Sequence, residues 1–251
     1  MKVSIITATY NSEKNITTCL ESVASQDYGN IEHIIIDGAS KDNTLNIVKQ
    51  FPHVHLVISE PDKGIYDALN KGLALASGEI VGFLNSDDFF AETTTVRTIV
   101  ETFEKDKVDS VFGDIVFVRP DNLDRTIRYY SSKKFKPSKF AYGYMPAHPT
   151  FYTYKKFYDQ FGGFKINYKI SADYELLIRF LKVNAISFKY IEKIFVVMRT
   201  GGASNKNFLS RITLNREIVR ACRDNGIKTN LFKVSLKFFN KALEFLVVKK
   251  S

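Results

Sequence analysis

Over its first 110 residues, the chain alternates short apolar runs with segments in which apolar side chains recur at helical spacing. Runs of this length favour buried strands, and the periodic segments favour helices packed against them. Because the connections are short, the alternation predicts a doubly wound α/β sheet with mainly parallel strands. The expected strands are 2–7, 31–36, 54–58 and 79–84, and the expected helices are 12–24, 42–50, 64–76 and 93–103.

The pattern changes after residue 110. Two strands joined by a turn at Pro120 are expected first, followed by a basic, aromatic and irregular stretch at 131–144. A later helix, two more strands and two closing helices complete the chain. We therefore expect one domain over 1–205 and a helical extension over 206–251. The expected later strands are 109–118, 125–130, 186–191 and 194–199, and the expected helices are 172–182, 207–225 and 231–248.

Charge is distributed unevenly along the chain. Residues 1–110 hold 9 Lys/Arg and 17 Asp/Glu, whereas residues 111–251 hold 27 Lys/Arg and 10 Asp/Glu. A basic half of this kind predicts an anionic partner. An anionic phospholipid surface, a pyrophosphate-bearing substrate and nucleic acid all satisfy that requirement.

Cysteine content and apolar runs bear on the compartment. Cys19 and Cys222 are the only cysteines and lack metal-ligand spacing, so a reducing environment is expected rather than a disulfide framework. We see neither a secretory signal nor an apolar run of membrane-spanning length. A cytoplasmic protein is therefore expected.

Polar clusters follow three of the predicted strands, at 7–12, 37–40 and 85–88. In open α/β sheets, ligands bind outside the carboxyl ends of the strands, so these clusters predict a site. Asp87 and Asp88 are adjacent carboxylates that repel each other unless a cation lies beside them. Mg²⁺ and Mn²⁺ take such oxygen ligands and bridge to phosphates. The alternative is a solvated turn in which one aspartate caps the next helix.

Four segments, taken in order and at their spacing, carry a resemblance to a known family. They are Ile6-Thr7-Ala8-Thr9-Tyr10-Asn11, Ile36-Asp37-Gly38-Ala39-Ser40, the stretch 60–72 (EPDKGIYDALNKG) and Leu84-Asn85-Ser86-Asp87-Asp88. Together they resemble the motifs of family-2 inverting glycosyltransferases with the GT-A fold, over about residues 1–205. The resemblance implies a three-layer α/β/α architecture with a nucleotide-binding half at 1–110 and an acceptor-binding half at 111–205. It also implies a nucleotide-sugar donor, with a UDP-sugar as the family expectation.

The resemblance implies roles for individual residues around the donor. The first strand end would flank the base, Asp37 would accept a hydrogen bond from a uracil-like N3–H, and the 62–63 pair would approach the base, ribose or phosphates. The implied donor-binding residues are Thr7, Thr9, Tyr10, Asp37, Asp62 and Lys63.

The acidic turn matches the metal motif of the family. Asp88 is the expected ligand of Mn²⁺ or Mg²⁺, and Asp87 is expected near the ribose or the metal. Many relatives carry Asp where this chain has Asn85. The metal shell here is therefore expected to depend more on Asp88 and on phosphate oxygens.

An inverting transfer also needs a base for the acceptor hydroxyl. Residues 170–177 are similar to the acid motif at a helix start in the family, with Ala172 in place of the usual Glu and Asp173 retained. Asp173 is therefore the expected base, and Glu175 is the nearest rival. A carboxylate at a helix start is also a common cap, which is the structural alternative.

Three further residues are expected at the acceptor or the diphosphate. His148 precedes a predicted strand in the acceptor region, although a lone histidine is as often structural. Arg199 and Ser204 flank Gly201 and Gly202 in a segment that looks like the Gly-Gly-x-Ser of the family. There they would bind the pyrophosphate, unless the segment is a simple turn.

The expected function is transfer of a sugar to a glycan or lipid-linked acceptor in polysaccharide biosynthesis. A metal-dependent nucleotidyltransferase is the alternative, but the loop 7–12 has neither glycine nor Lys/Arg. A non-enzymatic protein that binds RNA or membranes would leave the acidic strand ends unexplained. A dinucleotide oxidoreductase would need a glycine-rich loop after the first strand. Nucleic acid is therefore not expected as the partner.

The stretch 231–248 is apolar with interspersed lysines, a composition typical of a helix in a membrane interface. Contact with the anionic inner face of the cell membrane is expected, because the basic half adds attraction. Packing on the domain and dimerisation are the alternatives.

Overall fold

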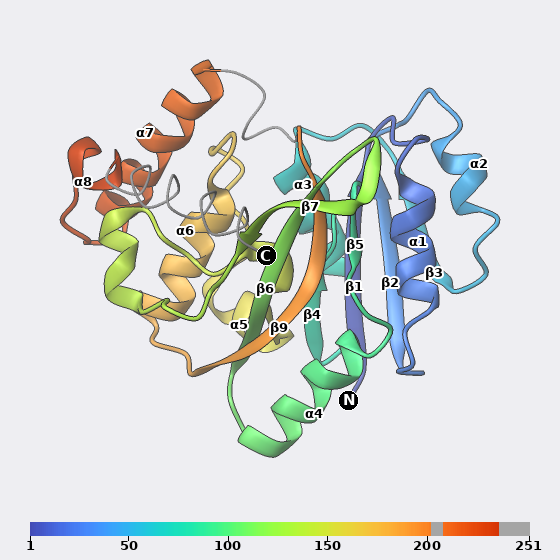
Figure 1. Cartoon of the computed structure of the whole chain (residues 1–251), viewed down its shortest axis with the longest axis horizontal. Helices are drawn as coiled ribbons and strands as arrows, with labels where there is room; N and C mark the ends of the chain where they lie inside the picture. Colours follow the sequence, from blue (N-terminus) through green and yellow to red (C-terminus); the bar gives the residue numbers. More distant parts are fainter. Residues whose placement is uncertain (202–207, 236–251) are drawn as a thin grey trace.

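A mixed sheet forms the centre of the computed structural model, which describes residues 1–201 and 208–235 (Figure 1). Its strands lie in the order β3-β2-β1-β4-β8-β6-β9-β5, and β7 pairs with β6 outside that path. The strands are β1 (Val3–Thr9), β2 (Ile31–Asp37), β3 (Val54–Ser59), β4 (Ile80–Phe83), β5 (Asp88–Phe90), β6 (Ser110–Arg119), β7 (Asn122–Tyr130), β8 (Tyr152–Tyr154) and β9 (Phe188–Arg199).

The first four strands form the parallel part of the sheet, in agreement with the alternation seen in the sequence. β1 pairs in parallel with β2 on one side and with β4 on the other, and β3 pairs in parallel with β2. All seven residues of β1 are buried, as expected for a strand covered on both faces. The carboxyl ends of these strands therefore share one edge of the sheet.

The later strands make the sheet mixed. β8 runs antiparallel to β4 and β6, β9 runs parallel to β6, and β5 runs antiparallel to β9. The segments predicted as two strands, 186–191 and 194–199, form the single strand β9. The exposed residues Glu192 and Lys193 interrupt the apolar pattern there, and they lie where the register against β6 shifts.

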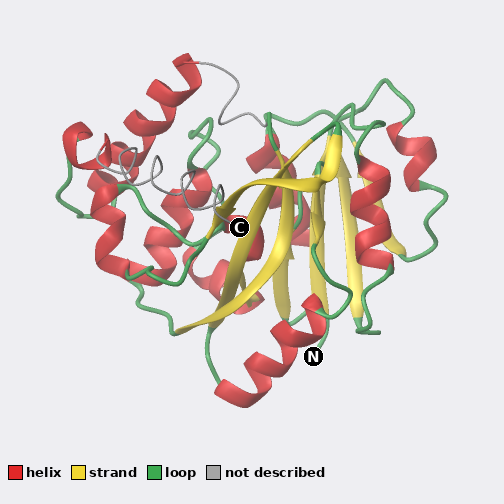
Figure 2. Ribbon diagram, in the orientation of Figure 1, coloured by secondary structure: helices red, strands yellow, loops and turns green. Residues whose placement is uncertain are grey.

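Helices cover both faces of the sheet and give three layers (Figure 2). One face carries α3 (Ile65–Leu75), α5 (Lys155–Phe161) and α6 (Ala172–Ile178), and the other carries α1 (Ile16–Ala24), α2 (Thr44–Val48) and α4 (Thr95–Asp106). Along β1, Ile6 packs into a core cluster with Leu69 of α3. The neighbouring Ile5 packs into a second cluster with Val23 of α1 and Val96 of α4.

Gly72 allows α3 to approach the sheet closely. A Cβ atom at Gly72 would lie 2.4 Å from Cγ2 of Ile6 on β1, so a larger residue would push the helix away. The helix follows Gly64, whose φ of +111° is readily adopted only by glycine. This placement brings the start of α3 to the carboxyl edge of β1.

The first helix starts later than expected. The sequence predicts a helix over 12–24 that begins at Ser12, but α1 begins at Ile16 with Asn15 at the N-cap. The Ser12 hydroxyl instead lies 2.9 Å from the Ser86 hydroxyl. It therefore joins the loop after β1 to the acidic turn after β4.

The described part of the C-terminal extension packs on the domain. α7 (Phe208–Asp224) contacts α6, and α8 (Leu231–Ser235) contacts the 3₁₀ helix η1 (Pro137–Tyr142) (Figure 1). Residues 236–248 of the predicted last helix lie outside the described residues. None of the helices in the described ranges is long and apolar enough to cross a membrane.

Candidate active site

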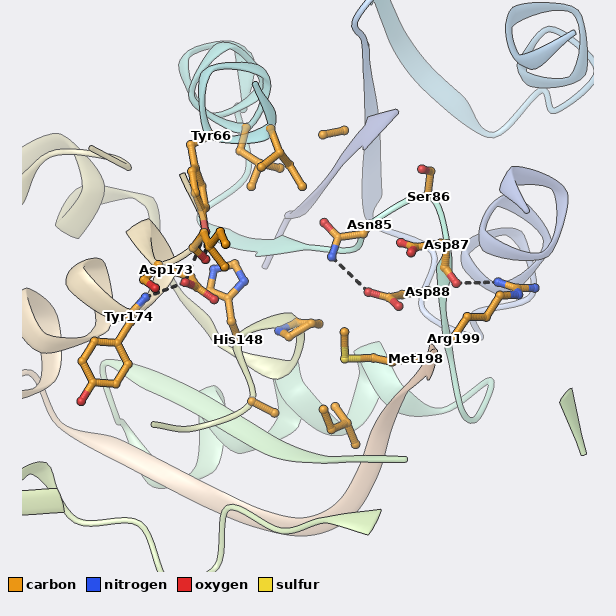
Figure 3. Close-up of a pocket in the computed structure, with 18 of the residues that line it drawn as sticks. Tyr66, Asn85, Ser86, Asp87, Asp88, His148, Asp173, Tyr174, Met198 and Arg199 are labelled. Carbon is orange, nitrogen blue, oxygen red and sulfur yellow. Dashed lines mark hydrogen bonds between the residues drawn. The ribbon is translucent and has the colours of Figure 1, made fainter. Parts of the chain in front are cut away.

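A cavity of about 700 Å³ opens at the carboxyl edge of the parallel strands. Its lining comes from the loops after β1 and β4, from the start of α3, and from segments 143–149 and 169–174 of the second half. Figure 3 shows the acidic turn and Arg199 at one side, with Asp173, Tyr66 and His148 at the other. The topology therefore brings residues far apart in the sequence to one site.

The acidic turn is held in a defined shape. The backbone N–H of Asp88 donates to the carbonyl of Asn85 at 3.0 Å, and the Asn85 side-chain amide donates to Oδ2 of Asp88 at 3.0 Å. Asp88 is 1% exposed, and its Oδ1 has no hydrogen-bond partner among the described residues. Asp88 is also the first residue of β5, a strand that the sequence did not predict.

The electrostatics of this turn favour a cation. Burial raises the pKa of Asp88 well above its usual value, and the charge of Asp87 adds to this, while Asn85 and Arg199 oppose it. Burial also raises the pKa of Asp87. Arg199, 7% exposed at the end of β9, donates to the backbone carbonyl of Asp87 at 2.6 Å. A divalent ion beside Asp88 would satisfy its unpartnered oxygen and stabilise the ionised form of both acids.

The residues present fit a weakly ligated hard cation rather than a metal cage. In the ranges that the structure describes, no cluster of three His, Cys, Asp or Glu side chains could hold a metal. Mg²⁺ commonly binds through one or two carboxylates and completes its shell with water and substrate phosphates. Asp88 would be the carboxylate ligand of such an ion, with Asp87 beside it.

Three of the six residues implied to bind the nucleoside lie on the cavity wall. They are Thr9, Tyr10 and Asp62. Oδ1 of Asp62 accepts from the backbone N–H of Gly64 at 2.7 Å. A Cβ at Gly38 would lie 2.6 Å from Asp62 and 3.3 Å from the Tyr10 ring, so the loops after β1, β2 and β3 converge at this glycine.

The other three residues do not line the cavity. Thr7 is fully buried, and its Oγ1 lies 3.0 Å from Nε2 of His33. Asp37 is also fully buried and accepts hydrogen bonds from its neighbours on both oxygens, among them Ser59 Oγ at 2.6 Å. Lys63 donates through its backbone to Asp67 at 3.0 Å. Asp37 therefore shapes the loop after β2.

Asp173 lies on the cavity wall at the start of α6. Its Oδ1 accepts from the backbone N–H of Tyr174 at 2.8 Å and lies 3.4 Å from the Tyr66 hydroxyl. Burial raises the pKa of Asp173 to about 6, while these two hydrogen bonds oppose the rise. A carboxylate with such a pKa is suited to accept a proton near neutral pH.

The rival acid, Glu175, does not line the cavity. It is fully buried, and it pairs with Arg179 at 2.9 Å and with Lys165 at 2.7 Å. Burial alone would raise the pKa of Glu175, but hydrogen bonds from Arg179 and Lys165 lower it. Glu175 is therefore part of a structural ion-pair cluster.

His148, in the 3₁₀ helix η2 (His148–Thr150), lies on the cavity wall. Its ring stacks on Phe83 with 5.8 Å between centroids, and its Nε2 is buried without a hydrogen-bond partner in the described chain. Burial lowers the pKa of His148 to about 4, so the ring is neutral at physiological pH. Ser204 lies outside the described residues.

The sequence did not single out Tyr66, whose hydroxyl donates to the carbonyl of Ile170 at 2.5 Å and approaches Asp173. It connects α3 of the first half with the start of α6 in the second. The only indication of Tyr66 in the sequence was its place within the matched segment 60–72.

Comparisons with known proteins agree with this geometry. The model of the family described as glycosyl transferase family 2 matches residues 4–169. A PGL/p-HBAD biosynthesis glycosyltransferase of Mycobacterium bovis is 28% identical over 225 residues, which are 86% of this chain and 85% of the relative. An uncharacterised glycosyltransferase of Mycobacterium tuberculosis is 34% identical over 182 residues, which are 70% of this chain and 68% of the relative.

Solved structures share the fold. TarS of S. aureus, in complex with UDP-GlcNAc, has a TM-score of 0.71 at 21% identity and covers 91% of this chain and 68% of its own. The mannosyltransferase PcManGT of Pyrobaculum calidifontis, in complex with GDP-Man and Mn²⁺, has a TM-score of 0.66 at 20% identity, with coverage of 89% and 63%. The GT-A-like fold expected from the sequence is confirmed.

Proposed function

The chain belongs to glycosyl transferase family 2, and from this premise we propose that it transfers a sugar, with inversion, from a UDP-sugar to a hydroxyl group of a glycan or lipid-linked acceptor. Family membership decides against the nucleotidyltransferase and the non-enzymatic alternatives. The observation that carries the proposal is that one cavity holds a buried, partly unpartnered Asp88 and, across it, an Asp173 whose pKa is raised to about 6.

The donor half of the site would bind a nucleoside diphosphate. Thr9, Tyr10 and Asp62 line the nucleoside end, and Asp88 with Asp87 lies where the diphosphate would meet Mn²⁺ or Mg²⁺. When bound, such an ion neutralises the charge that develops on the leaving diphosphate. The two structural neighbours were solved with UDP-GlcNAc and with GDP-Man, which supports a nucleotide-sugar donor.

The acceptor half would supply the base. As the acceptor oxygen forms a bond to the anomeric carbon, the bond from that carbon to the diphosphate breaks, and the hydroxyl proton passes to the Asp173 carboxylate. Attack from the face opposite the diphosphate inverts the anomeric centre. His148, neutral and with an unpartnered Nε2 in the described chain, would hydrogen-bond the acceptor or the diphosphate.

A biosynthetic role at the inner face of the cell membrane is part of this proposal. The second half is strongly basic, and Leu231 and Phe232 at the start of α8 are 51% and 74% exposed. Apolar side chains next to basic residues are suited to an anionic membrane surface. A lipid-linked acceptor would be available there.

The test is release of nucleoside diphosphate by the purified chain with a panel of UDP- and GDP-sugars, with Mn²⁺, with Mg²⁺ and with a chelator. We expect release with one UDP-sugar and a divalent ion, and an inverted anomeric configuration in the product. Turnover that a chelator leaves unchanged would contradict the metal part, and a retained configuration would contradict the role of Asp173.

A further inference from the structure

The loop directly before the helix of the base is held from outside the segment matched by the family model. That match ends at residue 169, whereas Asp173 and the whole of α7 come later. Glu217 of α7 accepts hydrogen bonds from three consecutive backbone N–H groups: Lys169 at 2.7 Å, Ile170 at 2.9 Å and Ser171 at 3.0 Å. One side chain thus binds the whole peptide segment directly before α6.

The same segment is held on its other side by α3. The Tyr66 hydroxyl donates to the carbonyl of Ile170, whose N–H donates to Glu217. Both backbone polar groups of Ile170 are therefore hydrogen-bonded, three residues before the helix residue Asp173. Tyr66 also lies 3.4 Å from Oδ1 of Asp173, so the hydroxyl bridges the loop and the carboxylate.

We propose that Glu217 is a positioning residue for the catalytic base, because it fixes the loop 169–171 so that the Asp173 carboxylate faces the acceptor in the cavity. This inference rests on the proposed function. It makes the C-terminal extension a component of the active site rather than an appendage. In support, Leu214 and Ile218, on the same helix as Glu217, line the cavity.

Other contacts show that α7 follows this loop closely. Arg220 donates to the carbonyl of Asn167 at 3.2 Å, and the Tyr168 hydroxyl donates to Asp224 at 3.1 Å. Those two contacts fix the loop before residue 169. Glu217, by contrast, binds the peptides directly next to α6.

Glu217 and Tyr66 shift the pKa of Asp173 in opposite directions. The direction of the shift in each variant therefore distinguishes an effect on the base from a general effect on folding. The negative charge of Glu217 raises the pKa of Asp173, and the hydrogen bond from Tyr66 lowers it, beside the larger effect of burial. The backbone N–H of Tyr174 also lowers the pKa of Asp173. Removal of the Glu217 charge should therefore move the acidic limb of the rate profile to lower pH, and removal of the Tyr66 hydroxyl should move it to higher pH.

The experiment compares Glu217→Gln, Glu217→Asp and Tyr66→Phe with wild type in the full chain, with Arg216→Gln as the control on the exposed side of α7. Glutamine has one acceptor oxygen in place of two, so at least one N–H loses its partner. We expect kcat to fall by about 10-fold or more in Glu217→Gln, because a small misplacement of a catalytic group has effects of this size. UDP affinity should stay unchanged, and the acidic limb should move down.

Further readouts decide the outcome. Amide hydrogen exchange at 169–171 should be faster in Glu217→Gln and unchanged in Arg216→Gln. Glu217→Asp keeps the charge but is one methylene shorter, so kcat should fall while the acidic limb stays in place. If Glu217→Gln does not fold, Glu217→Asp carries the test through kcat and exchange.

Two results would overturn the inference in distinguishable ways. Wild-type kcat in Glu217→Gln, combined with loss of transfer in Asp173→Asn, would remove the positioning role and leave the proposed function in place. Wild-type kcat in Asp173→Asn would remove the base assignment and the positioning role together.

Discussion

The side-chain amide of Asn85 donates a hydrogen bond to Oδ2 of Asp88 at 3.0 Å, and Oδ1 of Asp88 has no partner in the described chain. One oxygen is therefore fixed by the protein and the other remains available. Because Asn85 supplies a neutral donor, it orients Asp88 without adding a second negative charge beside it. We propose that this pairing leaves Asp88 as the single metal ligand of the acidic turn.

Asp88→Asn should remove most of the metal-dependent turnover. An amide cannot replace a carboxylate as an anionic ligand, so we expect release of nucleoside diphosphate to fall by at least about 100-fold, in keeping with the several kcal/mol that a Lewis-acidic ion contributes. The measurement is the rate at saturating Mn²⁺ and donor. A variant that keeps both its rate and its metal dependence would show that the ion is held elsewhere.

Asn85→Asp should strengthen the response to metal. The substitution replaces the donor to Asp88 with a third carboxylate, so repulsion rises without metal and attraction to a divalent ion rises with it. We expect a lower Tm in chelator and a larger increase in Tm on addition of Mn²⁺ than in wild type. Asn85→Ala is the control, because it removes the hydrogen bond but adds no charge. Equal metal-induced shifts in the two variants would contradict a role for charge.

Some of this site could be predicted from the sequence, and some could not. Asp88 and Asp173 lie within segments that resemble motifs of the family, and both lie on the cavity wall. Thr7 does not line the cavity. The sequence could not show this, because every residue of β1 is buried and the strand has no alternation that would indicate which face a polar residue takes. The contact between Asp37 and Ser59 depends on the pairing of β2 with β3, which no local pattern records.

The fold, like the site, could be predicted from the sequence only in part. The four parallel strands were predicted from apolar runs of five or six residues, whereas β5 and β8 have three residues each and are too short to show a period. Glu217 lies in a helix that was correctly predicted at 207–225, yet helical spacing does not reveal that its carboxylate binds the loop before α6. Long-range contacts of this kind become visible only in three dimensions.

The rate should fall in acid with an apparent pKa of about 6, the value to which burial raises the pKa of Asp173. The base works as a carboxylate, so kcat/KM should be constant above this pH and decrease as pH falls through it. Asp173→Asn should lower kcat by about 10²- to 10⁴-fold, the usual contribution of a general base, and should leave donor binding intact. An unchanged acidic limb in a residual activity would assign that limb to another group.

The same shift gives Asp173→Asn a stability signature. Because the folded pKa is about 6 and the ordinary value is 3.8, the unfolded chain ionises more readily, and the folded state loses stability as pH rises between these values. Asp173→Asn has no carboxyl to ionise, so it removes this loss of folding stability. Its Tm at pH 7 should therefore equal or exceed that of wild type, and a lower Tm would point to a structural role for the carboxylate.

Leu231 and Phe232 should contribute to binding at an anionic membrane. Phe232 is 74% exposed at the start of α8, and insertion of a large apolar side chain is worth a few kcal/mol at most. We expect the double substitution Leu231→Ser with Phe232→Ser to weaken binding to phosphatidylserine vesicles by about 10-fold. Sedimentation with vesicles measures this, and neutral phosphatidylcholine vesicles are the control. Unchanged sedimentation would place the contact elsewhere.

Glu175→Gln should damage stability rather than chemistry. The carboxylate is fully buried, and its loss leaves Arg179, which is 12% exposed, without its anionic partner. Breaking a buried pair in this way costs about 3 kcal/mol, toward the lower end of the usual range because Arg179 keeps hydrogen bonds to the carbonyls of Phe161 and Gly162. Urea unfolding measures the loss, and kcat per folded molecule should match wild type.

Asp173→Asn should show the reverse, with stability retained and transfer lost. The two acids lie on the same helix, but of the two only Asp173 lines the cavity. A Glu175→Gln variant that is stable but inactive would exchange these two roles.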